Sequence, residues 1–302
     1  MKRIAAVVVT YNRLDDLKKC LVSLQTQTRQ LDTIYVVNNG STDGTSEWLA
    51  KQSDLTVLTQ ANLGGAGGFA TGIAQAYHDE YDGIWCMDDD CLATPNALDN
   101  LLCSPNIGPC IKNSVSLSSQ LNDELAFFVD LPNKAFRHAA DMASFDMLFG
   151  VAALFNGTLI SSEVIKTIGV PDKKLFIWGD EVEYMSRAQK MGFPVVTIPK
   201  SIFYHPPSVD RDGIPWPGAW KNYYRIRNER RVFQNAHGNK YGFIMFLFWS
   251  IRATFNQLAA FRKNRMYNFL LFAEASFDSL LNNFRKRPET IFTLRLYRFM
   301  HK

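Results

Sequence analysis

Short apolar runs alternate with amphipathic segments at the start of this sequence, and this alternation limits the possible folds more than any other feature. The run Ile4–Val9 is apolar at every position, which is typical of a strand buried on both faces of a parallel sheet. Leu14, Leu17, Leu21 and Leu24 recur at helical spacing directly after it. Strands that alternate with helices predict an α/β fold whose ligands bind at the carboxyl ends of the strands.

Further strands are predicted at 33–37, 55–58 and 84–87, with helices ending near Ala50 and spanning 70–77. The polar segments that follow the strands are therefore expected on one rim, and they are 10–13, 38–43, 62–68 and 88–90.

The pattern is less regular after residue 90. Strand-like pieces occur near 107–111, 124–129 and 145–154. A capped helix at 161–169, a helix that ends near Lys190 and strands at 194–198 and 201–204 are predicted beyond them.

Three successive carboxylates, Asp88 to Asp90, end the apolar segment Ile84–Met87. Side chains alternate along a strand, so we expect Asp88 and Asp90 on one face and Asp89 on the other. Hard oxygen ligands of this kind suit Mg²⁺ or Mn²⁺. The alternative is a solvated acidic loop that caps a helix beginning near Pro95.

The segment Asn62–Phe69 is rich in glycine and precedes a predicted helix. Its free backbone amides would suit phosphate oxygens, and the alternative is an ordinary flexible loop. A dinucleotide-binding fold would place its glycines after the first strand, where this chain has Tyr11-Asn12-Arg13. The pattern therefore excludes a Rossmann dehydrogenase.

Composition and cysteine usage point to a globular protein of a reducing compartment. With 302 residues and 47% apolar content, the chain can bury a sizeable core. The N-terminus shows no apolar segment of signal length. The cysteines are odd in number, lack CxxC spacing and mostly fall in apolar stretches, so we expect buried free thiols and a cytoplasmic location. They are Cys20, Cys86, Cys91, Cys103 and Cys110.

Charge is distributed unevenly along the chain. Residues 221–302 hold 16 Lys and Arg against 4 Asp and Glu, whereas residues 1–220 hold 17 against 25. The apolar run Tyr241–Ile251 is 11 residues long, short of the roughly 20 that span a bilayer. We expect 240–302 to contact the inner face of the cell membrane, with a helical lid or a homo-oligomer seam as the alternative. Nucleic acid is not an expected partner, because large apolar residues interleave the charges.

Several motifs, taken together in their order, make the chain resemble a family 2 glycosyltransferase of the GT-A fold. They are Val7–Arg13, Val37–Gly44, Asn62–Gly65, Met87–Asp90 and Trp178–Tyr184, with Arg187 and His205 beyond them. The resemblance covers roughly residues 1–235 and is nearest to bacterial galactofuranosyl- and rhamnosyltransferases.

The resemblance implies an α/β fold with a mixed sheet flanked by helices. A GT-A catalytic domain would occupy 1–218, with a nucleotide-binding half at about 1–105 and an acceptor half at about 106–218. A basic, aromatic-rich helical C-terminal region would follow at 219–302.

The resemblance also implies a nucleotide-sugar site. Thr10, Tyr11 and Asn12 would line the base and ribose, and Asn38 or Asn39 would contact the base edge. The loop from Asn62, with Gly64, Gly65 and Gly67, would lie over the base and diphosphate. The remaining expected donor contacts are Arg13, Asp88, Asp89 and Trp178.

By the same resemblance, Asp88, Asp90 and His205 would hold Mn²⁺ or Mg²⁺. Glu181 would be the catalytic base of an inverting transfer, with Asp180 as the alternative. The implied donor is UDP-galactofuranose, with dTDP-rhamnose second, and the implied acceptor is a lipid-linked bacterial surface glycan such as an O-antigen. A sugar nucleotidyltransferase and a non-catalytic glycan-binding protein of the same fold are the rival hypotheses.

Overall fold

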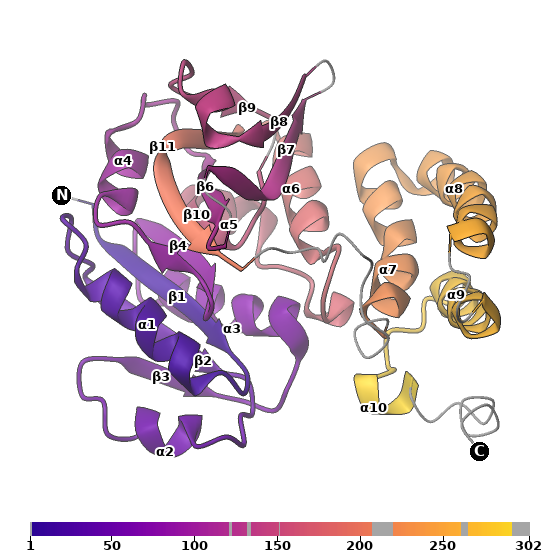
Figure 1. The fold of residues 1–302 in the computed structure, drawn as a ribbon, viewed down its shortest axis with the longest axis horizontal. Coiled ribbons are helices and arrows are strands. Elements are labelled where there is room, and N and C mark those ends of the chain that lie inside the picture. The colour runs from indigo at the N-terminus through magenta and orange to yellow at the C-terminus, as the bar shows by residue number, and fades with distance from the viewer. Residues whose placement is uncertain are drawn as a thin grey trace.

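The computed structural model describes residues 2–120, 123–131, 134–150, 152–206, 220–260 and 265–291 (Figure 1). The strands are β1 (Ile4–Thr10), β2 (Thr33–Asn38), β3 (Thr56–Thr59), β4 (Gly83–Asp88), β5 (Leu92–Ala93), β6 (Ile111–Ser118), β7 (Glu124–Leu131), β8 (Lys134–His138), β9 (Leu148–Phe149), β10 (Asn156–Ser161) and β11 (Val195–His205). The α-helices are α1 (Leu14–Gln25), α2 (Thr45–Leu49), α3 (Gly64–His78), α4 (Ala97–Cys103), α5 (Ser162–Ile168), α6 (Asp180–Lys190), α7 (Trp220–His237), α8 (Asn239–Ala260), α9 (Arg265–Leu280) and α10 (Pro288–Ile291).

The sheet is mixed, and its strands run in the order β3-β2-β1-β4-β10-β6-β11-β5. Strands β3, β2, β1 and β4 are parallel, whereas β10 runs antiparallel to both β4 and β6. The parallel half therefore ends beside the antiparallel β10, and the carboxyl ends of β1, β2 and β4 share one rim.

Helices cover both faces of this sheet, so the side chains of β1 are buried on both sides. Ile4, Ala6 and Val8 share one core cluster with the buried leucines of α1, α2 and α4. Ala5, Val7 and Val9 share the opposite cluster with α3, α5 and α6. The prediction of an α/β sheet buried on both faces is thus confirmed.

The helix predicted at 70–77 begins earlier, at Gly64, so the glycine-rich segment is helical and not an open loop. The physical reason is close packing against β1. A Cβ atom on Gly68 would lie 2.4 Å from Val9 Cγ1, and one on Gly72 would lie 2.4 Å from Val7 Cγ1. Glycine at these positions lets α3 rest directly on the sheet.

Elements in the second half were predicted less well. The strand expected at 107–111 starts at Ile111, and the one expected at 145–154 is reduced to β9. Strand β10 was missed altogether. The strands expected at 194–198 and 201–204 form one strand, β11. Four cysteines are buried as expected, but Cys103 is exposed.

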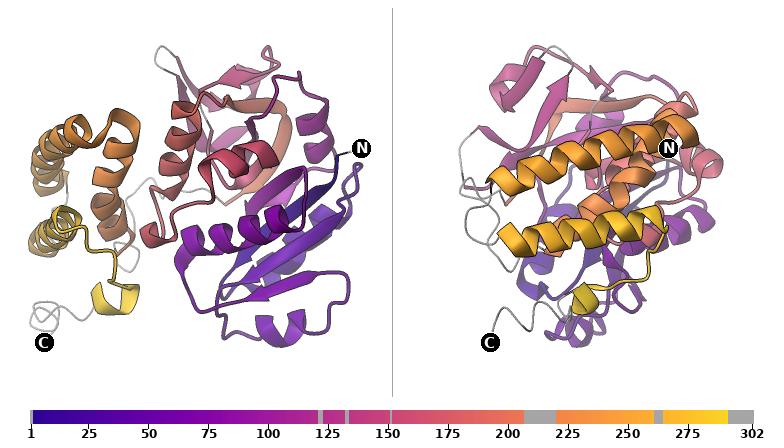
Figure 2. Two further views of the ribbon diagram at one scale, coloured as in Figure 1. Left: turned by 180° about the vertical axis from the view of Figure 1, so that it is seen from behind. Right: turned by 90° about the vertical axis from the view of Figure 1, so that its right-hand side faces the viewer.

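Helices α7, α8 and α9 form a separate layer beside the sheet and its flanking helices (Figures 1 and 2). Tyr223, Tyr224 and Ile226 of α7 share a core with Leu271 and Phe272 of α9. Phe176, which precedes α6, belongs to the same core. None of the helices in the described ranges is both long enough and apolar enough to cross a bilayer.

The packing of α3 yields a stability prediction. Gly72→Ala should lower the free energy of unfolding by about 1–3 kcal/mol, the usual cost of overpacking, because its Cβ would collide with Val7. Gly65→Ala is the matched control on the same helix, since no atom lies within 4 Å of its Cβ position. Urea unfolding of both variants tests this, and equal stabilities would contradict the close packing.

Candidate active site

The rim at the carboxyl ends of β1 and β4 gathers carboxylates around one guanidinium. Arg13 Nη1 lies 3.3 Å from Asp89 Oδ1 and also bonds to Asp90 Oδ2. The Tyr11 amide donates to Asp89 Oδ2 at 3.4 Å. Asp89 and Asp90 thus both turn toward Arg13, and the expected alternation of Asp88 and Asp90 against Asp89 is wrong. The reason is that β4 ends at Asp88, so the next two residues lie in a turn and not in a strand.

The crowding of carboxylates is visible in their pKa values. Burial, together with the charges of Asp90 and Asp89, raises the pKa of Asp88 to about 8. Burial also raises the pKa of Asp89 to about 6, although Arg13 opposes this shift. For Asp90 the effect of burial is outweighed by His205 and Arg13, so its pKa falls below the usual range. His205 and Arg13 are therefore the cations that keep Asp90 ionised among its neighbouring carboxyl groups.

His205, the last residue of β11, reaches this cluster. Its Nε2 lies 3.2 Å from Asp90 Oδ1, and its ring contacts Phe127 with centroids 4.7 Å apart. Burial would lower the pKa of His205, but Asp90 raises it above the ordinary value. A divalent cation bound here would take the place of that proton.

Potential ligand atoms of Asp90, Cys91 and His205 lie within 4.8 Å of one another. A carboxylate fits Mn²⁺ or Mg²⁺. A neutral imidazole is a common ligand of transition metals, so the pair favours Mn²⁺. The Cys91 thiol does not, because it donates to Asn156 Oδ1 at 3.5 Å and burial raises its pKa well above the ordinary value. Asp88 is outside this group of atoms, so its role as a ligand stays a prediction.

The expected base and ribose contacts lie on the same rim. Thr10 is buried and Tyr11 is exposed. Asn12 adopts φ 55° and accepts a hydrogen bond from the Thr42 amide at 2.7 Å, which ties the ends of β1 and β2 together. Donor contact by these residues stays a prediction.

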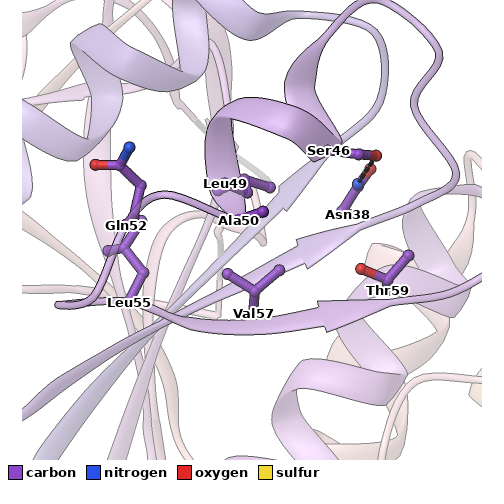
Figure 3. A pocket seen from close by; sticks show the side chains of 8 residues that line it. All are labelled: Asn38, Ser46, Leu49, Ala50, Gln52, Leu55, Val57 and Thr59. Atoms are coloured by element: carbon purple, nitrogen blue, oxygen red, sulfur yellow. Dashed lines mark hydrogen bonds between the residues drawn. The ribbon is translucent and has the colours of Figure 1, made fainter.

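Asn38 faces α2. Its Nδ2 donates to Ser46 Oγ at 2.8 Å, and both residues line a cavity of about 320 Å³ between α2 and the edge strands (Figure 3). Asn39 Nδ2 instead donates to Gly64 O at 2.9 Å, while its Oδ1 accepts from the Leu63 amide at 3.1 Å. Both amides therefore hold the rim together, and contact with a base edge stays a prediction for each.

The glycine-rich start of α3 meets the segment that carries the predicted base. Asn62 Oδ1 accepts from the Gly64 amide at 2.9 Å, and the Ala66 amide donates to Phe176 O at 3.1 Å. A Cβ atom on Gly64 would lie 2.0 Å from Phe176 O, so only glycine permits this approach. Gly65 has open space around it, and Gly67 packs on Leu63.

A backbone with unusual dihedrals leads into α6. Phe176, Trp178 and Gly179 have φ of 67°, 59° and 92°, and the non-glycine residues each cost about 1–3 kcal/mol in this region. Asp180 and Glu181 then begin α6, the helix predicted to end near Lys190.

The two acids at the start of α6 differ in their surroundings. Asp180 is buried, and its Oδ1 has no hydrogen-bond partner among the described residues. Burial, then the charge of Glu181, raises the pKa of Asp180 well above the ordinary value. Glu181 is half-buried, and its Oε2 accepts from the Gly179 amide at 3.1 Å.

Three residues of α7 that were not predicted from the sequence also touch this region. Arg227 and Asn228 hydrogen-bond to backbone carbonyls before α6. The Lys221 ammonium lies 5.9 Å from the centre of the Trp178 ring. Burial lowers the pKa of Lys221, and the charges of Asp88 and Asp90 oppose that shift. No sequence motif marks these residues. Arg227 and Asn228 bind backbone carbonyls and not side chains, and Lys221 belongs to a helix far along the chain from Trp178.

Comparison with known proteins places this arrangement in context. The family model described as "Glycosyl transferase family 2" matches residues 5–103. The galactofuranosyltransferase GlfT1 of Mycobacterium tuberculosis H37Rv is 37% identical over 217 residues, which cover 67% of this chain and 69% of the relative.

Solved structures share the fold at low identity. TarS residues 1–349 of S. aureus match with TM-score 0.56 and 14% identity over 99% of this chain and 92% of that chain. TarS has also been crystallised with UDP. A mannosyltransferase of Pyrobaculum calidifontis, solved with GDP-mannose and Mn²⁺, matches with TM-score 0.52 and 15% identity over 93% of this chain and 88% of that chain.

The geometry at Asp90 yields a metal-binding prediction. Asp90→Asn and His205→Ala should each raise the Mn²⁺ concentration needed for half-saturation about tenfold or more, because each removes one ligand. Calorimetric titration of Mn²⁺ measures this without relying on activity.

Glu163→Gln is the control, because Glu163 follows the end of β10 that pairs with Gly83, away from Asp88. Unchanged Mn²⁺ binding in both Asp90→Asn and His205→Ala would contradict a metal site at these two residues.

Proposed function

Because the chain belongs to glycosyltransferase family 2, we propose that it transfers galactofuranose from UDP-galactofuranose to a hydroxyl of a bacterial surface glycan. The observation that supports this most is the convergence of two acidic motifs far apart in sequence. After burial and the charges of Asp90 and Asp89, the charge of Glu181 also raises the pKa of Asp88, so the two carboxyl groups lie near each other. A donor site and a base would then face one reaction centre, as a single displacement requires. The identity to GlfT1 favours galactofuranose as the sugar.

Glu181 is our proposed base. A base must be ionised and accessible to the acceptor hydroxyl. The buried Asp180, with its raised pKa, meets neither condition, whereas Glu181 is half-buried and its carboxylate is held by the Gly179 amide. Asp180 would instead fix the start of α6. Attack from the side opposite the leaving group inverts the anomeric centre.

The leaving UDP must be stabilised by positive charge. Asp90 and His205, with Asp88, would hold Mn²⁺ or Mg²⁺, and such a cation neutralises diphosphate charge when bound. Arg13 would orient Asp89 and Asp90 through its two ion pairs. Lys221 stands over Trp178 and supplies a further cation on the same side.

A panel of sugar nucleotides tests the donor and the base together. We expect acceptor-dependent UDP release from UDP-galactofuranose and little nucleotide release from dTDP-rhamnose. Glu181→Gln should lower kcat by about 10² or more, the usual scale for a lost base, with UDP affinity kept.

Preference for dTDP-rhamnose would indicate a rhamnosyltransferase. Formation of pyrophosphate would indicate a nucleotidyltransferase. No turnover of any donor would favour a glycan-binding role. Loss of activity in Asp180→Asn but not in Glu181→Gln would exchange the two assignments.

We further propose that the acceptor is lipid-linked and that the outer face of α8 and α9 contacts the membrane. The two helices lie side by side on the side of the molecule turned away from the sheet (Figure 2). Exposed apolar side chains follow helical spacing on both: Tyr241, Ile244, Leu247, Phe248 and Ile251 on α8, and Phe269, Phe277 and Leu280 on α9.

The charges around this face suit an anionic bilayer. Lys240 and Arg252 are exposed at either end of the apolar stripe of α8, which has no acidic residue. The acidic residues of α9, Glu274 and Asp278, are turned inward and pair with Lys286. A symmetric contact between two copies would bring like charges together, so we favour lipid over a homo-oligomer.

Vesicle flotation tests the membrane face. We expect the protein to float with phosphatidylglycerol vesicles at low salt and to be released at high salt. Phe248→Asp should reduce flotation, because Phe248 is 71% exposed on α8.

Phe149→Asp is the matched control, since Phe149 on β9 is also a largely exposed aromatic, at 60%. Absence of the wild type from the floating fraction, with a dimer in sedimentation, would assign the face to a second copy.

A further inference from the structure

Two buried polar side chains of α7, Arg227 and Asn228, hydrogen-bond to the backbone of the segment that leads to α6. Asn228 is fully buried, and its Nδ2 donates to Leu175 O at 2.9 Å, Ile177 O at 3.1 Å and Trp178 O at 2.6 Å. One side-chain amide thus meets the backbone just before the turn and at two points within it.

Arg227, the neighbouring residue, adds hydrogen bonds to the same segment. Its Nη2 donates to Leu175 O at 2.9 Å and to Lys174 O at 3.3 Å, and its Nε donates to Asn228 Oδ1 at 3.1 Å. The last bond fixes which way the Asn228 amide faces, so that its nitrogen points at the carbonyls. Arg227 is itself buried, and its guanidinium lies 4.6 Å from the centre of the Tyr224 ring.

The segment needs such support because of its backbone conformation. Phe176 and Trp178 hold positive φ without being glycine, a state that persists only where the surroundings enforce it. Phe176 also stacks on Tyr224 of α7 with ring centroids 4.9 Å apart. Asn228 Cβ would lie 3.3 Å from a Cβ on Gly179, so α7 and the turn are in close contact.

We propose that Asn228, oriented by Arg227, is a positioning residue that holds the turn 176–179 and thereby aims the acid pair at the start of α6. Helix α7 then supports the acid pair directly. The inference rests on the proposed function only in taking Glu181 or Asp180 as the base, and either acid lies just after the same turn.

Asn228→Ala tests this, because it removes the amide that donates to Leu175 O, Ile177 O and Trp178 O, while Arg227 can still donate to Leu175 O. Hydrogen exchange followed by mass spectrometry should show faster exchange in peptides covering 174–184 and unchanged exchange in 4–10. For whichever donor the wild type uses, kcat should fall about tenfold or more, since small misplacements of reacting groups are costly. The Kd for UDP should stay within about twofold of the wild type, because the variant leaves the rim of β1 and β2 intact.

Arg230→Met is the matched control. Arg230 Nη1 donates to Ser279 O and Leu280 O, both at 2.8 Å, inside the helical layer, so its loss weakens the packing of the same helix, and none of its described contacts is to the turn. A fall in kcat that Arg230→Met reproduces at equal Tm would mean that Asn228 acts only through stability and would overturn the proposal. So would unchanged exchange in 174–184, or faster exchange there with wild-type kcat. Because exchange needs no substrate, a wrong donor assignment would leave this part of the result standing.

Discussion

Negative charge at the end of a buried strand is the constraint on which the rest of the site depends. Strand β4 lies between β1 and β10, so the carboxyl groups that follow it have limited access to water. Arg13 from the end of β1 and His205 from the end of β11 both pair with Asp90. Even so, the pKa of Asp88 is raised to about 8, because burial and the neighbouring carboxylates outweigh the charge of His205. A hard divalent cation bound here would supply the additional positive charge that stabilises the ionised carboxylates.

The same rim explains why glycine is used so heavily in α3. Strand β1 must end beside the aspartates, and α3 lies directly on β1 through Gly68 and Gly72. This close packing brings Gly64 against Phe176, and Phe176 in turn packs on Tyr224 of α7. The parallel half of the sheet, the acid pair of α6 and the C-terminal helices are therefore linked by one chain of close contacts.

Much of the first half could be predicted from the sequence, because β1, β2 and β4 are short apolar runs whose burial does not depend on distant partners. Strand β10 was missed, because Asn156 and Thr158 are polar. Their burial depends on bonds such as Thr158 Oγ1 to Asn113 Oδ1, 2.5 Å apart across two strands. The faces of the aspartates were wrongly assigned, since a pattern of alternation cannot show that a strand ends at Asp88. The role of Asn228 could not be predicted from the sequence, because its partners are backbone carbonyls, which every residue type carries.

We propose that the carboxyl end of β4 holds a divalent cation beside the donor diphosphate. Anomalous diffraction at the manganese edge, from crystals grown with Mn²⁺ and UDP, tests this. We expect one strong peak between Asp90 and His205, in contact with the diphosphate of UDP. UDP bound at this rim with no manganese peak, or with the peak on a different set of side chains, would contradict it.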